Sequence, residues 1–148
     1  MKALFDQKLL IEGLLLKPNM VTPGQDNGTK ATPGDIAMYT VRTLSRTIVP
    51  ALGGVTFLSG GSSEEDASLY LSAMNQIDKI PRPWALTFSY GRALQTSVLK
   101  AWQGKADNVK AAQEVLLVSC KRNGDASLGK YMGGTGATES DFVANYKY

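Results

Sequence analysis

Three stretches of the chain each combine a short apolar strand, a turn and a helix, and this repeated pattern most constrains the fold. The strands are expected at residues 8–16, 55–58 and 84–88. The pattern contains no hairpin signal between them, and continuous apolar runs are typical of strands that are buried on both faces. The sequence therefore predicts a parallel sheet with covering helices, which is the α/β class.

The expected helices begin at recognisable caps. Thr32 precedes Pro33, with Asp35 three residues after the cap, and Ser62 with Glu65 forms a second predicted capping box. Acidic residues 64–66 are interpreted as favourable charges at the start of that helix. A last helix is expected at roughly 107–122, with one apolar face made of Val109, Ala112, Leu116 and Cys120.

The chain falls into two parts that differ in how clearly they show helix and strand periodicity. Residues 1–122 carry the strands and helices, whereas residues 123–148 are rich in glycine and weakly patterned, and we expect a flexible C-terminal tail there. Three parallel strands leave two unpaired apolar edges, and such edges usually pair with something. The chain is therefore expected either to form a homo-oligomer or to be part of a larger sheet.

Composition excludes several classes of function. The 148 residues contain no histidine and one cysteine, which excludes His-dependent triads, imidazole-based zinc sites and internal disulfides. A formal charge of +3 without a basic stripe argues against a nucleic-acid partner. No apolar run approaches membrane-spanning length and no secretory leader is recognisable, so we expect a soluble intracellular protein.

Candidate functional residues follow each of the three strands. Lys17, the turn Ser59-Gly60-Gly61 and the turn Ser89-Tyr90-Gly91-Arg92 all come where a parallel strand ends, the edge at which α/β folds hold functional groups. Glycine turns that lead into helices favour phosphate, and an arginine adds a charged hydrogen bond. The pattern indicates a phosphate site, although such turns are also common as purely structural features.

Lys17 has two interpretations on residue pattern alone. A lysine at the end of a strand is most often simply solvated. A desolvated lysine, or one near another cation, keeps part of its amine neutral and can attack a carbonyl to form a Schiff base. The protonated imine is then an electron sink for making or breaking a neighbouring carbon–carbon bond.

Five segments resemble a known family across essentially the whole chain. "EGLLLKPNMVTPG", "FLSGGSSEED", "PWALTFSYGRALQ", "LKAW" and the terminal tyrosine are similar to the C-terminal half of class I fructose-bisphosphate aldolase. The resemblance implies the last three βα units of a (β/α)8 TIM barrel. It also implies a cytoplasmic glycolytic lyase that cleaves fructose 1,6-bisphosphate through a lysine Schiff base, without a metal or other cofactor.

The resemblance also assigns roles to individual residues. It implies that Lys17 is the Schiff-base lysine and that Tyr148 assists proton transfer as a tail tyrosine. Ser59, Gly60 and Gly61, together with Gly91 and Arg92, would bind the phosphate of the sugar phosphate substrate nearest the reacting ketone. The family commonly has threonine at Leu14 and glutamine at Ser62, which we interpret as local variation.

The chain is short for the fold that the resemblance implies. A closed barrel takes roughly 250 residues, so about five strands and the acid/base carboxylates they carry are expected to precede Met1. The chain alone is expected to be nearly inactive. The alternative is a truncated, non-catalytic aldolase-like fragment that acts as a binding or interaction module or has no independent function.

Overall fold

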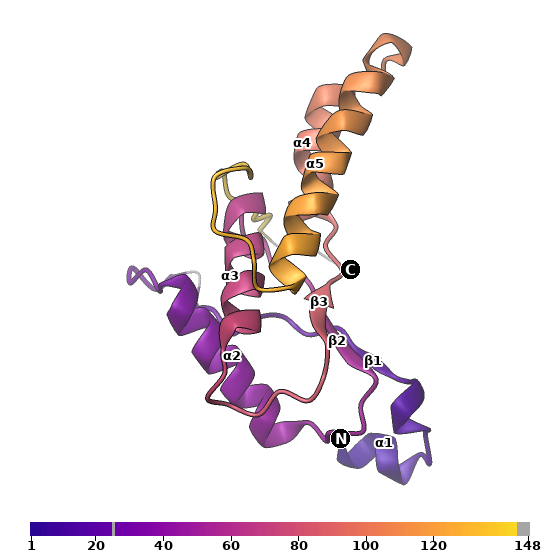
Figure 1. The fold of residues 1–148 in the computed structure, drawn as a ribbon, viewed down its shortest axis with the longest axis vertical. Helices are drawn as coiled ribbons and strands as arrows, with labels where there is room; N and C mark the ends of the chain where they lie inside the picture. Colours follow the sequence, from indigo (N-terminus) through magenta and orange to yellow (C-terminus); the bar gives the residue numbers. More distant parts are fainter. Residues whose placement is uncertain (25, 145–148) are drawn as a thin grey trace.

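The computed structural model describes residues 1–24 and 26–144, and its helices and strands alternate along the chain (Figure 1). In chain order the elements are α1 (Lys2–Asp6), η1 (Ile11–Gly13), β1 (Leu15–Leu16), α2 (Pro33–Thr47), β2 (Gly54–Phe57), α3 (Glu64–Gln76), β3 (Leu86–Phe88), α4 (Arg92–Trp102), η2 (Ala106–Asn108) and α5 (Val109–Ser127). Within the described chain, no helix combines the length and apolar character that crossing a membrane requires.

The sheet is parallel, as predicted, and its strand order is β1-β2-β3. Leu16 pairs with Val55 in β2, which in turn pairs with Leu86 in β3. All three strands therefore end at the same edge of the sheet. The α/β class is confirmed.

The core lies between β2 and the two helices α2 and α3. Val41 of α2, Val55 and Phe57 of β2, and Leu71 and Met74 of α3 are fully buried there. Figure 1 shows α4 and α5 running side by side, and α5 also packs against α3. The two helices that follow the predicted phosphate turns, α3 and α4, are thus both held by α5.

The first predicted strand is mostly wrong. Only Leu15 and Leu16 pair with β2, while residues 11–13 form a 3-10 turn. Leu10 and Leu15 are 72% and 67% exposed, so this run is not buried on both faces by the described chain. A short apolar run alone does not distinguish a strand from a helical turn, and Gly13 interrupts this one.

The helix starts agree with the prediction at one site and differ at the other. Thr32 caps α2, and the hydrogen bonds in both directions between Thr32 and Asp35 confirm the capping box. In α3 the cap is Ser63, whose hydroxyl accepts from the backbone N–H of Asp66 at 3.0 Å. The predicted box of Ser62 with Glu65 is wrong because the Glu65 carboxylate binds a distant segment instead.

Helix α5 is longer than predicted and buries a different face. It continues to Ser127, five residues past the expected end, and its buried residues include Ser119, Arg122 and Asn123. Leu116 and Cys120, which were expected on the inward face, are exposed. The face was mispredicted because polar side chains, which satisfy one another by hydrogen bonding, occupy the inward positions.

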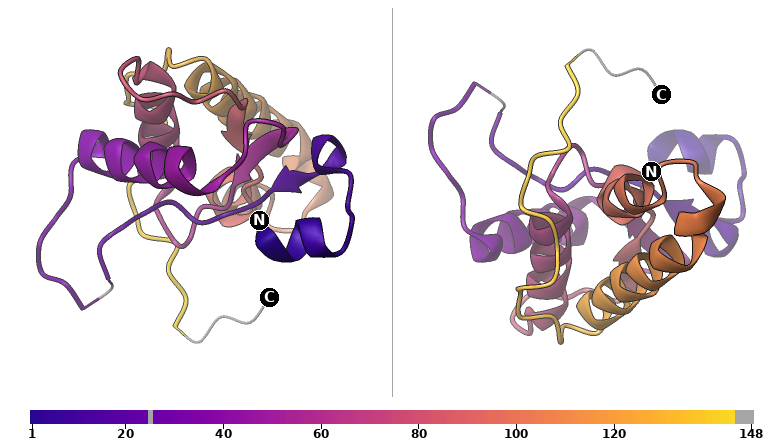
Figure 2. Two further views of the ribbon diagram at one scale, coloured as in Figure 1. Left: turned by 90° about the horizontal axis from the view of Figure 1, so that it is seen from below. Right: turned by 90° about the horizontal axis from the view of Figure 1, so that it is seen from above.

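The segment that follows α5 runs back past α3, as Figure 2 shows, and then reaches the turn after β2. Glu65 accepts hydrogen bonds from the Tyr131 hydroxyl at 2.6 Å and from the backbone N–H groups of Gly134 and Gly136 at 2.6 and 2.7 Å. Asp141 donates its N–H to the Gly61 carbonyl at 3.1 Å. The predicted flexibility of residues 123–148 stays a prediction, although residues 123–127 are helical.

Candidate active site

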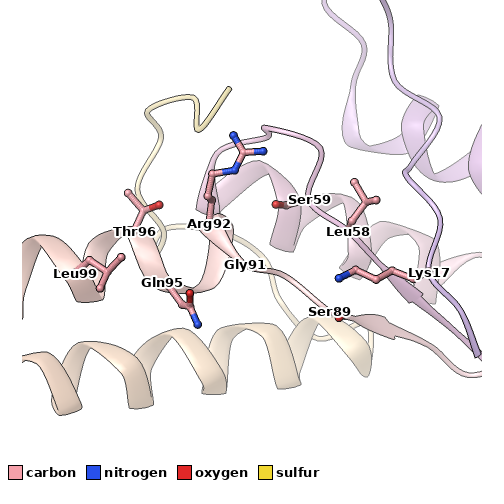
Figure 3. A pocket seen from close by; sticks show the side chains of 9 residues that line it. All are labelled: Lys17, Leu58, Ser59, Ser89, Gly91, Arg92, Gln95, Thr96 and Leu99. Carbon is pink, nitrogen blue, oxygen red and sulfur yellow. The ribbon is translucent and has the colours of Figure 1, made fainter. Parts of the chain in front are cut away.

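A cavity of about 340 Å³ opens at the carboxyl ends of the strands, where the candidate residues were expected (Figure 3). Five candidate residues of the sequence analysis line it together: Lys17, Ser59, Ser89, Gly91 and Arg92. Its remaining lining residues are Leu58, Gln95, Thr96 and Leu99. The structure therefore brings groups from all three strand ends to one place.

Lys17 enters this cavity from the end of β1. The carbonyl of Pro18 accepts from the Leu58 N–H at 3.0 Å, which continues the contact between the two chain segments beyond the sheet. This bond keeps the start of the Lys17 side chain beside the turn after β2. Figure 3 shows the side chain extending toward the region of Ser59 and Ser89. Its exposure fits a solvated lysine, whereas its place in the cavity fits a nucleophile.

The turn after β2 brings one serine into the cavity and two glycines against other segments. Ser59 is buried and lines the cavity, whereas Gly60 and Gly61 do not. Gly60 has φ +60°, and a Cβ there would lie 2.5 Å from Asn19 Oδ1. Gly61 has φ +86°, and a Cβ there would lie 2.9 Å from the Phe142 Cα. The glycines therefore allow close approach by the Lys17 loop and by the C-terminal segment.

The turn after β3 places an open backbone and a cation at the cavity. Ser89 donates its N–H to the Phe57 carbonyl at 2.8 Å, which fixes the turn beside β2. Gly91 caps α4, and no atom lies within 4 Å of where a Cβ on it would stand. Arg92 begins the helix, and its guanidinium donates to the Asp141 carbonyl. A helix start with an arginine beside it attracts an anion.

Comparison with known proteins decides the family. The model for class I fructose-bisphosphate aldolase matches residues 1–148. The cytoplasmic isozyme of fructose-bisphosphate aldolase from Spinacia oleracea is 59% identical over 150 residues. The chain belongs to the class I fructose-bisphosphate aldolase family. The resemblance inferred from the five segments is confirmed.

Other aldolases give the same result. Fructose-bisphosphate aldolase from Drosophila melanogaster is 57% identical. A solved Plasmodium falciparum aldolase, in complex with TRAP and an inhibitor, is 58% identical with a TM-score of 0.86 over 90% of this chain. The chain covers 42%, 41% and 38% of these three aldolases, respectively, so it spans about two fifths of their length. Its fold is a partial aldolase TIM barrel.

Four residues that line the cavity were not among the residues predicted from the sequence: Leu58, Gln95, Thr96 and Leu99. Gln95, Thr96 and Leu99 follow Arg92 by three, four and seven residues, and helical spacing places such residues on the same side of α4 as Arg92. That spacing could have found them. Thr96 also donates to Asp141 Oδ1 at 3.0 Å.

Two tyrosines, Tyr90 and Tyr148, stand at or near candidate functional positions in the sequence. Tyr90 is buried in the turn after β3, its hydroxyl donates to the Ala67 carbonyl at 2.9 Å, and burial raises its pKa far above the ordinary value. It is therefore a packing residue that ties β3 to α3. Tyr148 lies outside the described residues.

Proposed function

We propose that this chain supplies the Schiff-base lysine and a substrate phosphate site for class I aldol cleavage of fructose 1,6-bisphosphate. The products would be dihydroxyacetone phosphate and glyceraldehyde 3-phosphate. The observation that carries the proposal is the convergence of Lys17, Ser59, Gly91 and Arg92 on one cavity at the strand ends. Its volume is within the range of ligand pockets, which is roughly 300 to 1,000 Å³.

Lys17 would perform the covalent chemistry. Its neutral amine attacks the substrate ketone, and loss of water gives a protonated imine. The imine accepts the electron pair of the bond between the carbon next to the former carbonyl and the carbinol carbon beyond it. A general base takes the proton of that carbinol hydroxyl as the bond breaks, so that the aldehyde leaves and an enamine remains on Lys17. Protonation of the enamine carbon and hydrolysis then release the ketose product and restore the amine.

The two turns would bind the phosphate of the substrate. The Ser59 hydroxyl, the N–H groups at the start of α4 and the Arg92 guanidinium are groups that hydrogen-bond to a phosphate. Gly60 and Gly61 keep the first turn tight rather than lining the cavity, so their role would be indirect. Tyr148 would assist proton transfer, as the resemblance implies.

The test is borohydride trapping on the full chain with dihydroxyacetone phosphate. Peptide mass spectrometry should find the reduced adduct on Lys17, and Lys17→Arg should abolish it. Labelling at Lys100 or Lys105 instead would contradict the assignment. Lys100 is a suitable internal control because it pairs with Glu139 at 2.8 Å.

The second candidate is a non-catalytic fragment that acts through association. The exposed leucines before and within β1, together with the unpaired sheet edges, favour it, because apolar groups and open edges promote pairing. A homo-oligomer would cover these surfaces. Sedimentation and borohydride trapping on Lys17, measured on the same sample, separate the candidates, because a fragment that only associates would form no adduct. Relatives named as cytoplasmic or cytosolic support a cytoplasmic location for either candidate.

A further inference from the structure

A buried ion pair lies behind the candidate phosphate site and takes no part in the proposed chemistry. Arg122 of α5 and Glu64 of α3 are 4% and 2% exposed, and Arg122 Nη2 lies 3.3 Å from Glu64 Oε2. Charges are rarely buried this completely unless they are paired and hydrogen-bonded. The hydrogen bonds that the two side chains make to neighbouring helices indicate what this buried pair does.

Glu64 connects the start of α3 to α4. It is the first residue of α3 and follows Gly61 by three positions. Its carboxylate accepts from the backbone N–H and from the hydroxyl of Ser97, each at 2.9 Å. The turn after β2 and the second turn of α4 are thereby fixed relative to each other.

Arg122 completes the connection from the other side. Its Nη2 also donates to the Ala93 carbonyl at 3.4 Å, and Ala93 is the residue next to Arg92. Its Nε donates to the Ser68 hydroxyl of α3 at 3.1 Å. One guanidinium therefore binds the first turn of α4 and the second turn of α3 at once, which a lysine ammonium cannot reproduce with the same geometry.

We propose that Arg122 and Glu64 are positioning residues that set the separation between the Ser59–Gly61 turn and the Arg92 end of α4. The inference rests on the proposed function, in which both turns bind one phosphate. Neither side chain lines the cavity. Because a displacement of about 1 Å can cost a factor of about 100 in a positioned site, loss of the pair should weaken phosphate binding by about 10- to 100-fold.

The decisive variant is Glu64→Gln with Arg122→Met. Either single change leaves one member of the pair as a buried charge without its partner and destabilises the fold, whereas the double change leaves neither member charged. The double variant should therefore recover stability but not phosphate affinity. A purely structural role predicts that the two properties recover together.

Inorganic phosphate is the probe, with its dissociation constant measured by calorimetry on the full chain and stability measured by urea unfolding. Trapping of dihydroxyacetone on Lys17 by borohydride should proceed at the wild-type rate in the double variant, because this ketone has no phosphate. Lys121→Met with Asp125→Asn is the matched control. It removes an exposed pair on the same helix and should leave phosphate binding unchanged.

The outcomes separate this inference from the proposed function. A wild-type chain that binds no phosphate would overturn both. Wild-type phosphate binding that persists unchanged in the double variant would overturn the positioning role alone. A double variant without cooperative unfolding would also overturn it, because the pair would then hold the whole fold. Arg122→Lys, which keeps the charge and loses the fork, should weaken phosphate binding as well.

Discussion

Gly136→Ala should separate the C-terminal segment from α3. A Cβ on Gly136 would lie 2.7 Å from the Cα, the backbone N and the Oε2 of Glu65. The backbone of a buried helix start cannot move away, so overpacking costs about 1 to 3 kcal/mol. The hydrogen bond from the Gly136 N–H to the carboxylate, 2.7 Å long, contributes roughly 1.5 to 3 kcal/mol more because its acceptor is charged. Together the two costs predict a loss of about 2.5 to 6 kcal/mol.

Urea unfolding measures this loss, and hydrogen exchange locates it. The N–H groups of Gly134 and Gly136 should exchange faster in the variant, because both donate to Glu65 in the wild type. Gly124→Ala is the matched control, since it makes the same chemical change inside α5 where no atom lies within 4 Å of the added Cβ. It should stabilise the chain by about 0.5 to 1 kcal/mol.

Unchanged stability in Gly136→Ala would refute the reasoning. So would wild-type exchange at Gly134, because the carboxylate would then be holding the segment despite the added methyl group. An equal loss in Gly124→Ala would show that the change from glycine to alanine, rather than the contact with Glu65, is responsible.

Three further predictions concern stability. Burial would raise the pKa of Glu65, but the hydrogen bonds from Tyr131, Gly134 and Gly136 hold this pKa below the ordinary 4.5. The stability that the Glu65 carboxylate contributes is therefore fully present above pH 4.5 and is lost as the pH falls through the lowered pKa. The urea midpoints at about pH 7 and about pH 3 should thus differ less in Glu65→Gln than in the wild type. Thr32→Ala removes a cap and should cost about 1 kcal/mol in urea unfolding. Phe57→Ala should lower the thermal midpoint more than Thr32→Ala, because the cavity left in the core costs about 3 to 5 kcal/mol.

Local patterns predicted the features that depend on residues near one another in sequence. The cap at Thr32 and the parallel direction of the strands are of this kind, because the first follows from a few neighbouring residues and the second from the helix expected between consecutive strands. The convergence of Lys17 with the two turns was expected for the same reason. Parallel strands that follow one another in a sheet end at the same edge, and the five segments that resemble class I aldolase predicted the family directly.

Contacts that join distant residues could not be predicted in this way. Glu65 resembled a capping-box carboxylate, but its partners lie 66 to 71 positions further along the chain. The inward face of α5 was mispredicted because Ser119, Arg122 and Asn123 are buried through a hydrogen-bonded network rather than by apolarity. Hydrophobic periodicity carries no information about such a network.

The hydrogen bonds from the C-terminal segment to the Glu65 carboxylate have a consequence for synthesis on the ribosome. The chain emerges from its N-terminus, so α3 is made well before Tyr131 and Gly136 exist. During that interval the Glu65 carboxylate stays hydrated, and the start of α3 remains open. A product of premature termination before residue 131 would keep this defect permanently, which gives proteases and chaperones a lasting exposed site by which to recognise it.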